Sequence, residues 1–290
     1  METIQSLLKM GEERLHASSR EQSPRLHSEL LLMAATGLDR TSLYLQLSNP
    51  VPIPVTTRFW NHIQRRVSGE PIQYITGKTA FYGYDFSVGK GVFIPRFDSE
   101  VIVERSIALL GENAGERIPI TILDLCSGCG ALGLTIAAEV PGSVVTLSEN
   151  NPLAIDFARL NTNRMGLEQR VTFYEKDVLK PFPEDWDGKF DLIVANPPYI
   201  PLAEVEELAL EVQGFEPGVA LTDGGDGLSF YRVWAESVPM LLTKPGKFIT
   251  EIGDGAAKDV KTILARSFTE IGVIQDISGK DRALLCRRVV

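Results

Sequence analysis

From residue 118 onward, short apolar runs alternate with longer stretches of helical periodicity, and this alternation constrains the fold more than any other feature. Strands that alternate with helices form a mostly parallel sheet with helices on both faces. We therefore predict a doubly wound α/β domain. Its seven expected strands cover residues 118–125, 144–147, 171–174, 190–195, 247–252, 273–277 and 283–289. No helical pattern separates the last two, which predicts an antiparallel hairpin at one edge.

The first 95 residues follow a different pattern. Apolar residues recur at helical spacing over residues 1–70, which predicts an N-terminal bundle of helices. We expect this bundle to dock a substrate, although a simple lid fits the same pattern. The period changes to two over residues 71–95, which predicts a β-hairpin linker with strands at 81–88 and 91–94. The remaining residues, 96–290, form the predicted α/β domain.

The composition is that of an ordinary soluble globular protein, with 44% hydrophobic and 23% charged residues. No apolar run approaches the ~20 residues that cross a bilayer, and the amino terminus lacks the pattern of a secretory signal, so we expect no membrane association. The three cysteines do not make a disulfide framework, which favours the cytoplasm. A net charge of −9 disfavours general binding to a nucleic-acid backbone and fits a basic protein partner.

A buried strand is expected at residues 190–195, and Asn196, Pro197, Pro198 and Tyr199 follow it directly. Two prolines in a row exclude helix and ladder pairing, so the backbone must leave the sheet in an extended form. The Asn196 side-chain oxygen and the backbone carbonyls freed from the ladder can then accept hydrogen bonds from one amino group. Tyr199 can cover the flat face of that group. The pattern predicts a pocket for a planar NH2 group, such as a carboxamide or an aminopurine.

Three further signals follow the strands that precede this motif. Gly128 and Gly130 lie between the first strand and its helix, where they permit a sharp turn close to a ligand. Glu149 follows the second strand and can accept both hydroxyls of a ribose. Asp177, after the third strand, can accept from an adenine amino group, and Val178 can pack on the ring. Because these positions meet at the carboxyl edge of a parallel sheet, we expect an adenosine-bearing cofactor to face the planar-nitrogen pocket.

Four segments carry a resemblance to a known family. They are residues 71–77 (Pro-Ile-Gln-Tyr-Ile-Thr-Gly), 93–100 (Phe-Ile-Pro-Arg-Phe-Asp-Ser-Glu), 196–200 (Asn-Pro-Pro-Tyr-Ile) and 226–232 (Asp-Gly-Leu-Ser-Phe-Tyr-Arg). With them, nearly the whole chain resembles the release factor glutamine methyltransferases (PrmC/HemK), which are class I S-adenosylmethionine-dependent methyltransferases with a Rossmann-like domain. The resemblance implies methyl transfer to the side-chain amide nitrogen (N5) of the glutamine in the Gly-Gly-Gln motif of peptide chain release factors.

The resemblance also assigns roles to residues. It implies that Asn196, Pro197 and Tyr199 are catalytic, and that Pro198 and Phe93 join them in binding the substrate. No metal site is expected. The implied contacts to S-adenosylmethionine come from Asp124, Cys126, Ser127, Gly128, Cys129, Gly130, Glu149, Asp177, Val178 and Asn196.

The chain departs from the family at several positions: it has Cys126 where members usually carry Gly, Phe97 where they carry Pro, and Glu149 where they carry Asp. Glu149 keeps the carboxylate and lengthens its reach. Cys126 and Cys129 form a C-x-x-C pair, which also suits a redox pair or half of a zinc site. A disulfide between them is expected to distort the cofactor loop. Arg96 is expected to pair with the acidic side chains close behind it in the sequence rather than to act in catalysis.

Other activities remain open at this point. An adenine amino methyltransferase acting on DNA or RNA would use the same pocket on a flipped base, although the acidic charge disfavours it. Further alternatives are glutamine methylation of a ribosomal protein, a non-catalytic module that holds a release factor, and a nicotinamide dehydrogenase, which would need a third fingerprint glycine. We expect a cytoplasmic monomer whose partner is a release factor, without membrane or direct nucleic-acid binding.

Overall fold

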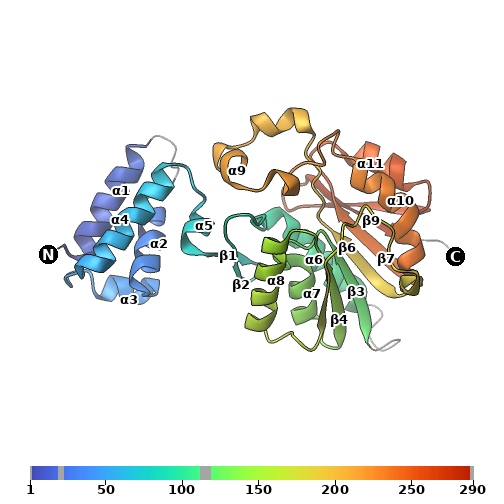
Figure 1. The fold of residues 1–290 in the computed structure, drawn as a ribbon, viewed down its shortest axis with the longest axis horizontal. Coiled ribbons are helices and arrows are strands. Elements are labelled where there is room, and N and C mark those ends of the chain that lie inside the picture. Colours follow the sequence, from blue (N-terminus) through green and yellow to red (C-terminus); the bar gives the residue numbers. More distant parts are fainter. Residues whose placement is uncertain (1, 19–22, 112–118, 288–290) are drawn as a thin grey trace. The chain divides into compact units, whose positions relative to one another are not determined.

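The computed structural model describes residues 2–18, 23–111 and 119–287, and Figure 1 shows its ribbon. Its contacts divide the chain into two compact units. One comprises Met1–Lys78 and Ala209–Phe215, and the other comprises Thr79–Leu208 and Glu216–Val290. The division falls at Lys78, whereas the sequence pattern placed boundaries at 70 and 95. The difference arises because residues 72–76 form a helix packed on the bundle, while the hairpin that follows packs on the sheet.

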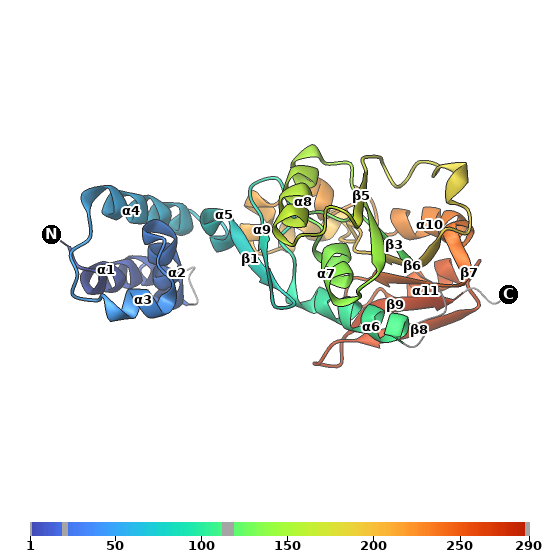
Figure 2. The ribbon, with the colours of Figure 1, turned by 90° about the horizontal axis from the view of Figure 1, so that it is seen from below.

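The first unit is helical, as its apolar spacing predicted (Figure 2). Its helices are α1 (Ile4–His16), α2 (Pro24–Thr36), α3 (Arg40–Leu45), α4 (Ile53–Val67), α5 (Ile72–Thr76) and α9 (Leu210–Phe215). Thr3 forms a capping box at the start of α1, Asp39 caps α3, and Gly37 ends α2 in the left-handed conformation. Helices α1 to α5 enclose a small core that includes Leu7, Leu15, Leu31, Leu32, Phe59 and Ile63.

A two-stranded hairpin, β1 (Lys78–Phe81) and β2 (Tyr84–Ser87), follows the helices. It lies earlier than predicted, and residues 91–94 do not form a strand. Val92 and Ile94 are buried nonetheless, because the segment packs against the sheet domain instead of pairing with a neighbour. The apolar alternation there reflects packing, so it gave the wrong strand.

The second unit contains the predicted sheet of seven strands. Their order is β5-β4-β3-β6-β7-β9-β8. The bounds are β3 (Ile120–Leu125), β4 (Ser143–Ser148), β5 (Val171–Tyr174), β6 (Phe190–Ala195), β7 (Leu242–Glu251), β8 (Glu270–Gln275) and β9 (Asp281–Arg287). The first five are parallel, and β9 runs antiparallel to both β7 and β8, which confirms the edge hairpin. Residues 118 and 288–289 of the expected strands lie outside the described residues.

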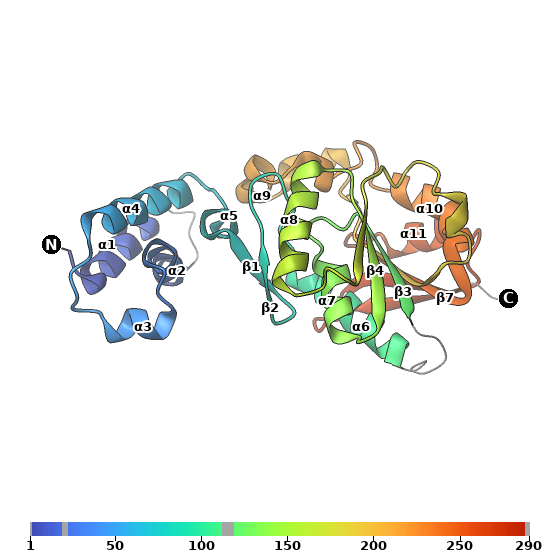
Figure 3. The ribbon, with the colours of Figure 1, turned by 60° about the horizontal axis from the view of Figure 1, so that its bottom comes forward.

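Different helices cover the two faces of this sheet, which confirms the doubly wound arrangement (Figure 3). One face carries α6 (Glu100–Gly111), α7 (Ala131–Glu139) and α8 (Pro152–Arg164), and the other carries α10 (Ser229–Leu241) and α11 (Ala257–Leu264). Ile122 of β3 belongs to the same apolar cluster as Leu134 of α7, whereas Leu123 belongs to the cluster of Trp234 of α10. Successive residues of a strand point to opposite faces, so both faces require apolar side chains.

The long connection after β6 is folded. It contains the 3-10 helices η3 (Leu202–Glu207) and η4 (Gly218–Ala220) on either side of α9. Two other 3-10 helices are η1 (Phe97–Ser99) and η2 (Glu184–Trp186). Within the described ranges, every helix is too short or too polar to span a bilayer.

Candidate active site

A cavity of about 270 Å³ lies at the carboxyl ends of β3, β4 and β6, and all of its walls belong to the second unit. In doubly wound sheets, ligands bind at this edge, where the chain order reverses between neighbouring strands. Every site residue predicted from the sequence except Gly130 lines this cavity. These are Phe93, Asp124, Cys126, Ser127, Gly128, Cys129, Glu149, Asp177, Val178, Asn196, Pro197, Pro198 and Tyr199.

Gly130 was predicted to contact the cofactor, but it lies outside the cavity lining. It adopts φ +86° at the start of α7, and a Cβ there would come within 2.8 Å of Leu134 and 3.2 Å of Leu147. Its role is therefore to turn the chain and to let α7 pack closely on the sheet. The sequence pattern located the turn, and the cofactor contact of this glycine stays a prediction.

The turn between β3 and α7 presents a buried acid to the cavity. Asp124 is fully buried, and its Oδ2 accepts a hydrogen bond of 2.8 Å from the backbone N–H of Gly133. Its Oδ1 is buried without a hydrogen-bond partner among the described atoms, as is the hydroxyl of Ser127. Burial raises the pKa of Asp124 to about 7. An unpaired buried acceptor is costly, so this carboxyl group is suited to a cationic or N–H-bearing ligand.

Glu149, at the end of β4, braces the same turn. Its Oε2 accepts from the backbone N–H of Gly128 at 2.9 Å, and its Oε1 accepts from Asn150 and Asn151, each at 2.9 Å. Each carboxylate oxygen has a further lone pair. The long glutamate side chain thus reaches the glycine turn and still lines the cavity with acceptors that suit ribose hydroxyls.

Asp177 and Val178 follow β5 and form another wall. Asp177 accepts from the Leu179 N–H at 2.9 Å through Oδ1. Val178 is buried, and its carbonyl accepts from the Trp234 indole N–H at 3.4 Å. Phe230 of α10, from the segment 226–232, adds an aromatic side chain to the lining, although no site role was predicted for it. This wall combines one carboxylate, which can accept from an amino group, with apolar surface, which can pack on a flat ring. Both features suit an adenine.

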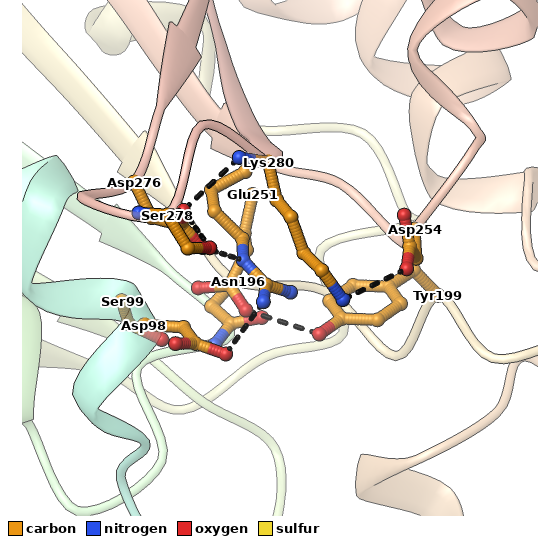
Figure 4. A network of polar contacts seen from close by, with 10 residues as sticks. Asp98, Ser99, Asn196, Tyr199, Glu251, Asp254, Asp276, Ser278 and Lys280 are labelled. Atoms are coloured by element: carbon orange, nitrogen blue, oxygen red, sulfur yellow. Dashed lines mark hydrogen bonds and ion pairs between the residues drawn. The ribbon is translucent and has the colours of Figure 1, made fainter.

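The Asn-Pro-Pro-Tyr segment also lines the cavity. The ladder between β6 and β7 ends at the pair Ala195 and Thr250, so the backbone after it is free of the sheet. Asn196 donates through Nδ2 to the Ser99 hydroxyl at 3.4 Å. Since the amide group donates on that side, its Oδ1 remains an acceptor for a ligand. The Tyr199 hydroxyl donates to Glu251 Oε1 at 3.1 Å (Figure 4).

Phe93 lies in the cavity wall, and Arg96 holds it there. The Arg96 guanidinium lies 5.0 Å from the centre of the Phe93 ring and forms an ion pair with the buried Glu216. Glu216 also accepts from the Ile94 N–H at 3.1 Å. Arg96 was expected to pair with the acidic residues just after it, which is wrong: Asp98 instead forms an ion pair with Arg282.

The cysteines of the C-x-x-C pair are free thiols in the cavity wall. Cys126 adopts φ +57°, a left-handed conformation that explains why glycine suits this position. Burial raises the pKa of Cys129 to about 12 and that of Cys126 well above its ordinary value. Thiolate formation, which both metal binding and disulfide exchange need, is therefore suppressed.

Sequence reasoning missed Ser99 and Glu251, which contact the side chains of the Asn-Pro-Pro-Tyr segment. Glu251 could have been noticed, because it is an acid at the end of an apolar strand, like Glu149. Ser99 carries no such signal, since only the fold brings it close to Asn196.

S-adenosylmethionine, the cofactor that the resemblance implies, has an ammonium group, a ribose and an adenine. The orphan acceptors at Asp124 and Ser127, the Glu149 carboxylate, and the wall formed by Asp177 and Val178 fit these groups in turn. The set of donors and acceptors is thus compatible with that cofactor.

Comparisons with known proteins also match this chain to methyltransferases. The profile of the PrmC N-terminal domain matches residues 6–77, and that of the methyltransferase small domain matches residues 87–223. The release factor glutamine methyltransferase of Chlorobaculum tepidum is 37% identical over 272 residues, which cover 93% of this chain and 92% of the relative. That of Bacillus subtilis is 35% identical, with coverage of 98% and 97%.

Among solved structures, the catalytic domain of hMettl16 in complex with an RNA hairpin matches with a TM-score of 0.54 at 12% identity, covering 81% of this chain and 82% of that one. This similarity shows the fold alone. The relatives that match over nearly full length show the family. The chain belongs to the release factor glutamine methyltransferases.

Proposed function

We propose that this protein transfers a methyl group from S-adenosylmethionine to the side-chain amide nitrogen (N5) of the glutamine in the Gly-Gly-Gln motif of peptide chain release factors. The orientation of Asn196 is the observation that carries the proposal. Its Nδ2 is tied to Ser99, so Oδ1 is available to accept from a substrate NH2 group. The cavity that Asn196 lines extends to the acceptors assigned to the cofactor.

An amide nitrogen is a poor nucleophile because its lone pair is delocalised into the carbonyl. When bound, the cofactor supplies a methyl group that its sulfonium makes electrophilic. Asn196 Oδ1 and the Pro197 carbonyl would accept the two amide hydrogens and so fix the direction of the nitrogen. The same acceptors would stabilise the positive charge that develops on nitrogen in the transition state, and the methylated nitrogen would then release one proton to water.

The aromatic walls support this arrangement. Phe93 and Tyr199 line the cavity together with Asn196, so their rings can flank a flat carboxamide. Burial raises the pKa of Tyr199, which keeps the phenol protonated and available as the donor to Glu251. Apolar walls also exclude water, which strengthens the hydrogen bonds to the amide.

Partner, assembly and location follow from the same proposal. A release factor is the protein substrate, and the N-terminal helical unit docks it. The net charge of −9 supports a protein partner over direct binding to a nucleic-acid backbone. We place the enzyme in the cytoplasm as a monomer; its three cysteines are free thiols, which suits a reducing compartment.

The test is incubation with labelled S-adenosylmethionine and a purified release factor, followed by mass spectrometry. We expect one added methyl group on the glutamine of the Gly-Gly-Gln motif. A release factor with alanine at that glutamine is the matched control and should stay unlabelled. Labelling of DNA, RNA or a ribosomal protein in place of the release factor would refute the proposal.

A further inference from the structure

A buried glutamate stands directly behind the Asn-Pro-Pro-Tyr segment. Glu251 is the last residue of β7, next to Thr250, which pairs with Ala195 at the end of β6. It is 4% exposed and does not line the cavity itself. Its backbone carbonyl accepts from the buried Tyr231 hydroxyl at 2.7 Å, which fixes its position on the α10 side of the sheet.

The Glu251 carboxylate contacts one polar side chain of the motif directly, that of Tyr199, and Ser99 contacts the other, Asn196 (Figure 4). Its Oε1 accepts directly from the Tyr199 hydroxyl. The connection to Asn196 passes through Ser99, whose hydroxyl stabilises the ionised carboxylate and accepts from Asn196 Nδ2. Residues from three separate parts of the chain thus form one polar network.

The direction of these hydrogen bonds matters. A serine hydroxyl has one hydrogen, and when that hydrogen faces a carboxylate, the oxygen lone pairs are left to accept. Ser99 can then take a hydrogen bond only from the NH2 side of the Asn196 amide. If Glu251 were neutral, Ser99 could turn its hydrogen toward Asn196 and favour the reversed amide, whose NH2 would face the substrate.

We propose that Glu251 is a positioning residue, which in its ionised form sets the Asn196 amide and the Tyr199 ring in the orientation that binds the substrate carboxamide. The inference rests on the proposed function and extends it, because it explains what selects one of the two orientations of Asn196. Glu251 does not line the cavity, so it acts through Ser99 and Tyr199.

The groups around Glu251 act in opposite directions on the pKa of its carboxyl group. Burial raises the pKa of Glu251 to about 7, and Asp98 contributes to the rise. The Ser99 and Tyr199 hydroxyls and the Arg282 guanidinium oppose it. Arg282 itself forms two ion pairs. Its Nη2 lies 2.9 Å from Asp98 Oδ2, and its Nε lies 2.7 Å from Asp276 Oδ2. The Oε2 atom of Glu251 is buried without a hydrogen-bond partner among the described atoms, so it is the oxygen that can carry the proton of the neutral form.

Glu251→Gln tests the proposal, since glutamine keeps the shape and removes the charge. We expect kcat to fall about 10- to 100-fold, as for a substrate group misplaced by a fraction of an ångström, with cofactor affinity within twofold of wild type. In the wild type, kcat should fall as pH drops below about 7, because Glu251 becomes protonated. That acid limb should be absent from the variant.

Two further variants keep the test decisive if Glu251→Gln folds poorly. Ser99→Ala removes the link to Asn196 and leaves the bond between Tyr199 and Glu251, so kcat should fall while cofactor affinity persists. Thr250→Val is the matched control on the same strand, because the Thr250 hydroxyl donates to the backbone carbonyl of Glu251 rather than to its carboxylate. It should keep the wild-type kcat and acid limb.

A readout without substrate separates this inference from the proposed function. The side-chain NH2 signal of Asn196 in NMR should shift with pH around 7 in the wild type and stay constant in Glu251→Gln. A wild type that methylates no release factor would refute the proposed function and leave this readout intact. The positioning role is overturned if the Asn196 signal shifts equally in both proteins, or if Thr250→Val loses as much kcat as Glu251→Gln.

Discussion

Gly227 lies against the backbone of Tyr199, and replacing it with alanine should displace the whole Asn-Pro-Pro-Tyr segment. A Cβ at Gly227 would come to 2.1 Å from the Tyr199 carbonyl oxygen and 2.8 Å from its carbonyl carbon. Favourable contacts between heavy atoms begin at ~3.5 Å, so the Tyr199 backbone must move by more than about 1 Å. A misplacement of about 1 Å at a reacting group can cost about 100-fold in rate.

The same substitution also lowers stability by two separate effects. Gly227 has φ +77°, where alanine is strained by about 1–2 kcal/mol. Overpacking against Tyr199 adds about 1–3 kcal/mol. Gly224, in the same turn, has φ +78° with nothing within 4 Å of an added Cβ, so Gly224→Ala carries the strain without the clash.

The assay compares the two variants by urea unfolding, cofactor titration and methyl transfer to a release factor. We expect both variants to bind the cofactor. Gly224→Ala should keep the wild-type kcat. Gly227→Ala should lose about 100-fold in kcat and should show the larger loss of unfolding free energy. If kcat of Gly227→Ala stays within about threefold of the control, the position of Tyr199 does not govern the reaction and the reasoning is refuted.

Asn196→Ala should lower turnover by about 100- to 1000-fold while cofactor binding persists, because it removes a hydrogen bond made in the transition state; wild-type turnover would exclude that role. Burial raises the pKa of Asp124 to about 7, and the ammonium group of the cofactor favours the ionised form, so the dissociation constant should rise as pH falls below 7. Asp124→Asn should bind weakly with no such pH dependence, which calorimetry at pH 6 and pH 8 can check. The raised thiol pKa values of Cys126 and Cys129 predict much slower alkylation in the folded protein than in urea at pH 8. Rapid oxidative loss of cofactor binding that Cys129→Ser abolishes would instead support a disulfide switch.

The edge of the sheet that holds the site was predictable from the sequence. Glu149, Asp177 and Asn196 each follow a strand, and the carboxyl ends of parallel strands meet at one edge whatever the side chains do. The seven strands were predictable for a related reason, since buried parallel strands are short apolar runs separated by helices. Both results depend on local pattern and on a topology rule.

The parts that sequence pattern did not reveal depend on contacts between distant residues. Ser99 lies 97 residues before Asn196 in the chain, and Glu251 lies 52 residues after Tyr199. The β7 strand also begins earlier than predicted, at Leu242, because Leu242 pairs with Phe190 across a register shift despite the Pro-Gly that follows. Such pairings are decided by tertiary packing rather than by local preference.

The central claim is that two oxygen acceptors beyond β6 hold the substrate amide. A crystal structure with a Gly-Gly-Gln peptide and S-adenosylhomocysteine measures this directly. We predict that Asn196 Oδ1 and the Pro197 carbonyl oxygen both lie about 2.7–3.2 Å from the glutamine amide nitrogen. A glutamine nitrogen more than about 4 Å from both oxygens, or an Asn196 amide that turns its NH2 group toward the substrate, would contradict the account.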